Sequence, residues 1–198
     1  MTAQGHAIFA IALAIISKRA HLTPILTHGD WWHIISSAIL TSLLPDIDHP
    51  RSLLGQHLKW LSASMRVIFG HRGFTHSILA LAAAVKLFNL TLFLFSRVII
   101  PDDVRHGMII GYISHLIADS LTPAGIPWLW PLRWKLRFPI ILNLHPNQYI
   151  SERLFGLNLI VISILMPSYY LIALSRHIKI IPIQILQVVL HFLKKYIN

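Results

Sequence analysis

Two histidines, an arginine and a threonine stand beside a long apolar run in the stretch HRGFTHS, residues 71–77. Gly73 lies between His71 and His76 and permits a turn, so both imidazole rings could face one point. Arg72 carries a planar guanidinium group that can bind an anionic oxygen through two donors. The alternative is that these side chains lie at a membrane interface with their polar ends in water. The stretch alone leaves both interpretations open.

A second polar group occupies LLPDIDHP, residues 43–50, directly after an apolar segment. Pro45 and the pre-proline residue His49 favour an extended or turned backbone, which holds Asp46 and Asp48 close together. Two neighbouring carboxylates repel each other unless a cation lies between them. With an imidazole they supply ligands for a divalent ion, whereas the alternative is a turn in which an aspartate caps the next helix. This motif favours neither interpretation.

The third group lies in GYISHLIADSLTPAG, residues 111–125. His115 and Asp119 are four residues apart, which on a helix places both on one otherwise apolar face. A buried imidazole and a buried carboxylate are costly unless they pair with each other or bind a metal ion. A simple hydrogen bond between the two would satisfy both groups equally well.

The elements that must position these groups are five hydrophobic segments, residues 5–17, 31–45, 77–96, 106–122 and 154–175. The last contains no charged residue and is long enough to cross a hydrocarbon core, which needs about 20 residues. If all five cross in alternating directions, the three polar groups and His6 emerge on the same face. We therefore expect an all-α, multi-pass membrane helical bundle with about five hydrophobic helices and a polar metal site at one membrane face.

The domain organisation is expected to be simple. No repeat or low-complexity tract divides the chain, so residues 1–198 should form one membrane-embedded helical domain. Residues 151–198 would supply the last span, and within them residues 179–197 favour an amphipathic surface helix over a sixth short span.

The composition agrees with a membrane protein and limits the kinds of site. Hydrophobic residues make up 55% of the chain and charged residues 12%, against about 25% charged in soluble proteins. The chain has no cysteine, so a metal ion would be held by imidazole and carboxylate. The formal charge of +10 is scattered beside apolar segments, which favours anionic lipid headgroups over nucleic acid as the partner.

Taken together, an early His6, PDIDH at 45–49, HRGFTHS at 71–77 and HLIADSLTPAGIPWLWP at 115–131 resemble the YdjM-like bacterial inner-membrane proteins. That family is classed as membrane-bound metal-dependent hydrolases, and the resemblance covers roughly residues 1–150. More distantly, the ligand set looks like the zinc sites of bacterial phospholipase C and the S1/P1-type nucleases. The resemblance implies hydrolysis of a phosphoester, with lipid as a natural substrate, in the bacterial inner membrane.

The resemblance also implies roles for individual residues. A water molecule activated by the metal would be the nucleophile, with Arg72, Asp48 and His49 as the catalytic group and Thr75 and Thr122 orienting the ligands. Zinc is the expected metal, with manganese and iron as alternatives. Two ions suit the number of expected ligands, which are His6, Asp46, Asp48, His71, His76, His115 and Asp119.

A second class of function stays open, a non-catalytic divalent-metal-binding membrane protein such as a carrier or sensor. A carrier would place its ligands near the bilayer midplane, whereas a hydrolase would gather them at one interface beside an anion-binding arginine. The sequence shows the second pattern. The basic residues divide evenly between the two expected faces, so the positive-inside rule predicts no orientation.

Overall fold

The computed structural model describes residues 1–70, 72–95, 99–132, 134–138 and 147–177, and these residues are helical with no named strand. The expected all-α class is therefore confirmed. A single antiparallel bridge joins Ile126 to Leu136. The elements are α1 (Ala3–Arg19), α2 (Pro24–His28), α3 (Trp31–Ser42), the 3-10 turn η1 (Pro45–Asp48), α4 (Leu53–His57), α5 (Lys59–Phe69), the 3-10 turn η2 (Phe74–His76), α6 (Ile78–Leu94), α7 (Asp102–Ser120) and α8 (Gln148–Leu165).

Side-chain caps fix where the helices around the polar motifs begin. Thr2 accepts a hydrogen bond from the backbone N–H of Gly5 at the start of α1, and Asp30 accepts one from Trp32 at the start of α3. Ser77 caps α6 in the same way. These caps satisfy backbone donors that the first turn of a helix leaves without a partner. As a result, the polar motifs lie at helix boundaries, close to the positions expected from the sequence.

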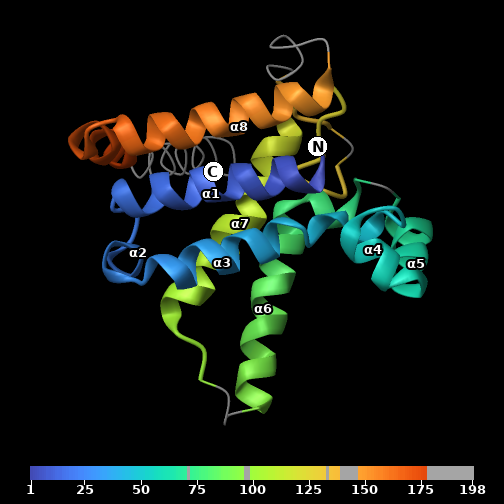
Figure 1. Ribbon diagram of the computed structural model, residues 1–198. Coiled ribbons are helices and arrows are strands. Elements are labelled where there is room, and N and C mark those ends of the chain that lie inside the picture. The colour runs from blue at the N-terminus through green and yellow to red at the C-terminus, as the bar shows by residue number, and fades with distance from the viewer. Residues whose placement is uncertain (71, 96–98, 133, 139–146, 178–198) are drawn as a thin grey trace, which may run out of the picture.

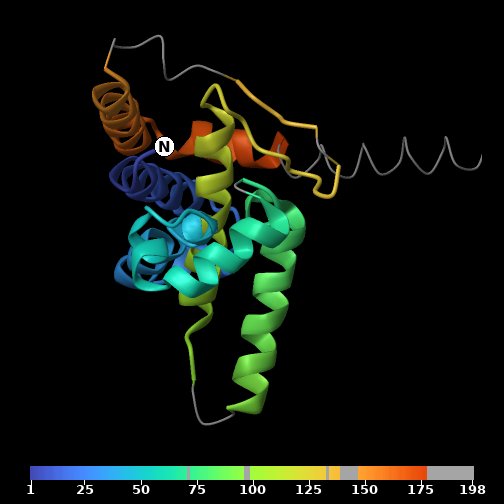
Figure 2. The ribbon, with the colours of Figure 1, turned by 90° about the vertical axis from the view of Figure 1, so that its right-hand side faces the viewer.

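The arrangement of the helices does not confirm the expected multi-pass bundle. Figures 1 and 2 show α1, α3 and α8 lying side by side, with α7 running across them and α6 projecting away from them. Close packing between α3 and α7 explains this arrangement, because a Cβ atom at Gly111 would lie only 2.1 Å from the carbonyl oxygen of Ala38. At Gly107 a Cβ atom would lie 2.1 Å from the hydroxyl of Ser37. The two glycines thus allow the backbones to touch where the helices cross.

Two clusters of buried apolar side chains hold this arrangement together. The first joins α1, α2, α3 and α7 and consists of Ala10, Ala14, Leu26, Ile34, Ala38 and Ile110. The second joins α6 and α7 to the chain that follows α7, and consists of Ala80, Tyr112, Leu116 and Ile126. Burial of such side chains is the main favourable term in folding. The core and the polar site share the helices α1 and α7, which carry His6 and His115 as well as core side chains.

Within the described residues, no single helix is both long and apolar enough to cross a membrane. Residues 154–175, expected as one continuous span, are instead two helices, Tyr149–Leu165 and Ser168–His177, bent by 106°. Pro167 stands at the break, where it lacks a backbone N–H and disfavours a helical residue before it. Residues 179–197, expected as a surface helix, lie outside the described residues.

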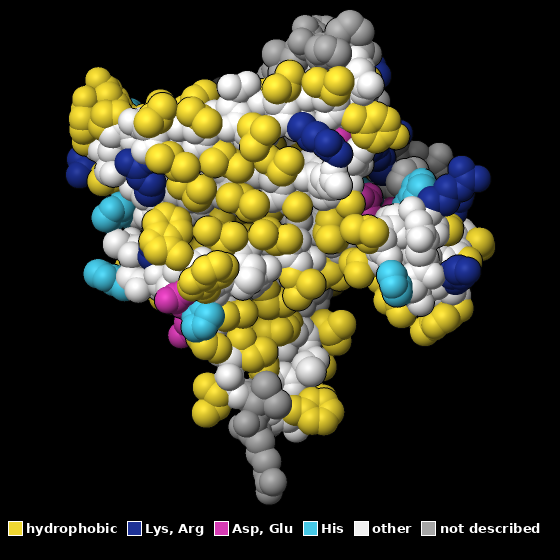
Figure 3. Space-filling model, viewed as in Figure 1, with side chains coloured by type: hydrophobic (Ala, Val, Ile, Leu, Met, Phe, Trp, Pro, Cys, Tyr) yellow, Lys and Arg dark blue, Asp and Glu magenta, His cyan; other side chains and the backbone are white. Residues whose placement is uncertain are grey.

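Apolar side chains nonetheless cover much of the surface. Figure 3 shows them over the face formed by α8, α1 and α3. Helix α6 projects from the body of the molecule (Figure 1) and exposes Leu87, Leu90, Phe93 and Leu94. A soluble monomer seldom exposes large continuous apolar patches. The surface therefore suits an apolar environment more than water.

Candidate metal centre

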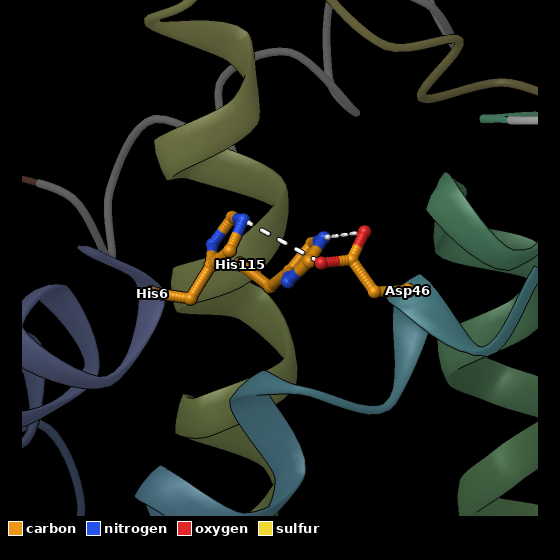
Figure 4. Close-up of side chains that lie close together, drawn as sticks. All are labelled: His6, Asp46 and His115. Carbon is orange, nitrogen blue, oxygen red and sulfur yellow. Dashed lines mark ion pairs between the residues drawn. The ribbon is translucent and has the colours of Figure 1, made fainter. Parts of the chain in front are cut away.

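Four separate elements bring imidazole and carboxylate groups into one buried cluster. His6 comes from α1, Asp46 and Asp48 from η1, His76 from η2, and His115 and Asp119 from α7. Figure 4 shows His6, Asp46 and His115 pointing toward one another. Only Asp46 is partly exposed, with 20% of its side chain accessible, whereas His6, His76, His115 and Asp119 are fully buried. We call these six residues the His/Asp cluster.

The backbone of α3 fixes the orientation of His115. Its Nδ1 atom lies 2.6 Å from the carbonyl oxygen of Ser42. Because a carbonyl can only accept, Nδ1 must carry the hydrogen, which leaves the lone pair of a neutral ring on Nε2. That Nε2 atom lies 3.2 Å from His76 Nε2 and 3.8 Å from Asp46 Oδ1. The lone pair of His115 Nε2 therefore faces the centre of the cluster.

The ring of His6 lies against the ring of His115. The two rings stack with centroids 3.8 Å apart. His6 Nε2 lies 3.4 Å from Asp119 Oδ1 and 4.0 Å from Asp46 Oδ2. Among the described residues, neither ring nitrogen of His6 makes a hydrogen bond. A buried ring without such partners is costly, and a metal ion would supply the missing interaction.

His76 presents Nε2 to the same centre, 3.6 Å from both Asp46 Oδ1 and Asp119 Oδ2. On the other side of its ring, Nδ1 lies 3.0 Å from Thr75 Oγ1 and 3.4 Å from Asp48 Oδ2. Asp48 Oδ2 also accepts a hydrogen bond from the Thr75 hydroxyl at 2.8 Å. Asp48 and Thr75 thus hold the His76 ring in place, as partners behind a ligating histidine commonly do.

These residues fit a metal ion. Two carboxylate oxygens and three imidazole Nε2 atoms meet in a buried space, where lone pairs facing lone pairs repel unless a cation or a proton lies between them. Asp119 already attracts positive charge, since the amino group of Met1 lies 2.9 Å from Oδ1 and Arg72 Nη2 lies 3.1 Å from Oδ2. Three groups, with ligand atoms within 4.8 Å of one another, could each hold an ion: His6, Asp46 and His115; His76, His115 and Asp119; Asp46, Asp48 and His76.

The pKa values of the two turn residues reflect this crowding. Burial alone would raise the pKa of Asp46, but the hydrogen bond from His76 and the nearby His115 and His6 hold it well below its usual range. Burial alone would lower the pKa of His76, yet hydrogen bonds to Asp46 and Asp48 raise it to about 9. Without a metal ion, the cluster therefore keeps a proton on His76 at neutral pH.

Metal binding should consequently strengthen as the pH rises from about 6 to about 9. A divalent ion must displace the proton of His76 below the pKa of that ring, and above it there is no proton to displace. One proton released per ion corresponds to about tenfold in affinity for each pH unit. Competition titration of the purified protein against a chelating dye at several pH values would measure this slope. An affinity that is flat or falls over this range would contradict the protonation assigned to His76.

Arg72 does not stand free as an anion-binding group. Besides its ion pair with Asp119, it donates a hydrogen bond from its backbone N–H to Asp48 Oδ2 at 2.9 Å. Its φ of 57° lies in the left-handed region, which is uncommon for a residue other than glycine and is found often at functional sites. The guanidinium also lines a cavity that reaches Asp46. Arg72 thus connects the carboxylates of the cluster to the space outside it.

The other expected residues take different positions. His49 lines the same cavity and accepts a hydrogen bond from the N–H of Arg51 on Nδ1 at 3.2 Å. The hydroxyl of Thr122 donates to the backbone carbonyl of Asp119 at 2.7 Å, so it caps the end of α7 instead of orienting a ligand side chain. His71 lies outside the described residues.

Two supporting groups were not found by sequence reasoning. Glu152 of α8 is buried, and its Oε2 atom accepts hydrogen bonds from the N–H and the hydroxyl of Thr2, at 2.8 and 2.9 Å. These bonds hold the start of α1, and therefore His6, against α8. Tyr112 donates from its hydroxyl to the carbonyl of Thr75 at 2.5 Å. One feature of the sequence could have pointed to Glu152, because it is the only glutamate in the chain.

The fold and the cluster define a class, an all-helical protein with a buried His/Asp site able to hold metal ions. A family model described as "YdjM inner membrane protein" matches residues 1–187, so the chain belongs to this family. It is 54% identical over 167 residues to the inner membrane protein YdjM of Escherichia coli (strain K12), covering 84% of this chain and 83% of that protein.

More distant relatives extend the similarity. The chain is 37% identical over 109 residues to the uncharacterized protein YvsG of Bacillus subtilis (strain 168), covering 54% of this chain and 63% of that protein. It is 32% identical over 102 residues to the inner membrane protein YbcI of Escherichia coli (strain K12), covering 50% of this chain and 53% of that protein. No solved structure matches the chain.

Proposed function

We propose that the chain is a metal-dependent hydrolase of the bacterial inner membrane and that it acts on a phosphoester. The observation that carries this proposal is the meeting of three imidazole Nε2 atoms with Asp46 and Asp119, next to a polar cavity that Asp46 lines. The names of the relatives, inner membrane proteins, support the location. The exposed apolar surface described above supports it independently.

The cavity gives the cluster a way to meet a substrate. It has a volume of about 450 Å³, within the range of about 300 to 1,000 Å³ common for ligand pockets. Asp46, the partly exposed member of the cluster, lines it together with His49, Arg51 and Arg72. Two guanidinium groups suit the oxygens of a phosphate, which they bind through paired donors. A carrier or sensor has no need for this anion-binding wall.

Each residue has a defined task in this proposal. His6, His76, His115, Asp46 and Asp119 hold the metal, while Asp48 keeps the His76 ring oriented. A bound divalent ion would lower the pKa of a water molecule and stabilise the negative charge that develops on phosphate oxygens. Arg72 binds a non-bridging oxygen of the substrate, and His49 lies in the cavity where it can give a proton to the leaving group. Zinc suits a set of nitrogen and oxygen ligands without thiolate, and the five ligand groups could be divided between two ions.

Hydrolysis by the purified protein tests the proposal. The protein, loaded with zinc or manganese, would be incubated with aryl phosphate monoesters and diesters, and the release of product would be followed before and after chelation. We expect turnover that chelation removes and that the same metal restores. The control is the His115→Ala variant purified in parallel, which reports contaminating hydrolases. Metal-loaded protein without activity above this control on any phosphoester would favour a carrier or sensor.

A further inference from the structure

A second cavity lies on the other side of Arg72. It has a volume of about 370 Å³ and runs between the end of α5 and the chain that follows α7. Its apolar walls are Ile68, Phe69, Pro127, Trp130, Pro131 and Leu132. Phe69 and Trp130 pack with ring centroids 5.8 Å apart, and both also contact the ring of Phe74. Because Phe74 belongs to η2, the wall of this groove is built on the turn that carries His76.

The charges of the groove are of one sign. Arg72 and Lys135 line it, and no aspartate or glutamate is among its described lining residues. Arg72 also lines the polar cavity at Asp46, so the two cavities meet at one guanidinium group. The Nε atom of Arg72 is buried and makes no hydrogen bond among the described residues. An apolar wall that ends at two cationic side chains, one of them with a donor free of hydrogen bonds to the described residues, suits a molecule that has an apolar chain and an anionic end.

We infer that the substrate is an amphiphile, an alkyl phosphate ester whose phosphate lies at Arg72 beside the cluster and whose chain lies in the aromatic groove. This inference rests on the proposed phosphoester hydrolysis and adds the part of the substrate that is not changed in the reaction. The apolar walls of the groove suit the hydrocarbon chain of a single lipid-like molecule. A free phosphate would occupy the polar cavity and leave the aromatic walls without a ligand.

A binding experiment tests this inference without requiring turnover. The probe is dodecyl phosphonate with a photoreactive diazirine near the end of its chain, because a phosphonate resists hydrolysis. After irradiation with the full-length protein in neutral detergent, labelled peptides would be identified by mass spectrometry. We expect adducts on peptides that contain Phe69 and Trp130. Unlabelled dodecyl phosphonate should compete about tenfold better than dodecyltrimethylammonium, since the two differ in the charge that meets Arg72 and Lys135.

Matched variants separate the groove from general hydrophobic binding. Trp130→Ala should reduce labelling about tenfold, because it removes a large apolar contact. Trp134→Ala is the control, since Trp134 is 81% exposed and does not line the groove. Should Trp130→Ala fold poorly, Lys135→Glu changes an exposed residue and should weaken phosphonate binding, with Lys59→Glu as its control. Equal competition by the cationic amphiphile, or labelling spread over α6, would overturn the inference.

Two results distinguish this inference from the proposed function. Hydrolysis of a short aryl phosphate without specific labelling of the groove would overturn the amphiphile and keep the hydrolase. Specific labelling together with no hydrolysis of any phosphoester by metal-loaded protein would overturn the hydrolase and keep an anionic lipid site.

Discussion

Replacing His115 with alanine should lower the affinity for zinc by more than about 100-fold. His115 belongs to two of the three groups that could hold an ion, and its ring separates His6 from His76. Loss of a group behind a ligand costs 10- to 100-fold in metal affinity in typical sites, so loss of a ligand should cost at least as much. Elemental analysis and competition titration of protein purified in detergent would measure the effect.

A suitable control is His33→Ala. His33 lies on the same helical scaffold, but it is 48% exposed and pairs with Asp103, away from the cluster. Circular dichroism should show equal helix content in both variants. Unchanged zinc content in the His115 variant would mean that the ion, if bound, lies elsewhere, and the proposed centre would have to be abandoned.

Replacing Arg72 with lysine should lower turnover by about 10- to 1000-fold while the bound metal is retained. Lysine keeps the charge near Asp119 but cannot offer the planar pair of donors that a phosphate oxygen meets in arginine. Turnover of an aryl phosphate and metal content would be measured on the same preparation. Arg66→Lys, on the exposed surface of α5, is the control for a general effect of the exchange.

The two readouts separate the roles that Arg72 could have. Lost turnover with full metal content supports contact with the substrate. Lost metal would instead assign Arg72 to holding Asp119, with which it forms an ion pair. Turnover equal to that of the unchanged protein would place the anion-binding group elsewhere in the cavity, where Arg51 is the remaining arginine among the described lining residues.

Much of the secondary structure could be predicted from the sequence, because continuous apolar runs and polar boundaries are local signals. The segments 5–17, 77–96 and 106–122 correspond to α1, α6 and α7. Pro167 is also a local signal for the break in 154–175, although the apolar composition of the segment alone indicates one continuous span. The crossing of α3 over α7 had no such signal, because it depends on the fit of Gly107 and Gly111 against a distant helix.

The candidate site likewise combines features that local sequence signals predict with contacts between distant segments that they do not. The His115 and Asp119 pair follows from helical spacing alone, and the structure brings the pair together with both other motifs. The partner of His115 Nδ1 could not be predicted, because it is the backbone carbonyl of Ser42, and every residue carries such a group. The ion pair between Arg72 and Asp119 joins residues 47 positions apart. Contacts of this kind become visible only when the packing of the helices is known.

The scattering of the cluster along the chain has a consequence for how the protein is made. Its members run from His6 to Asp119, and two of the three groups that could hold an ion need α7. At about 5 to 20 residues per second, a ribosome needs on the order of ten seconds to reach Asp119. Before His115 is made, the growing chain contains only one complete group of the three, Asp46, Asp48 and His76. An ion held by either of the two groups that need α7 would therefore bind only late in biosynthesis, after α7 has been made.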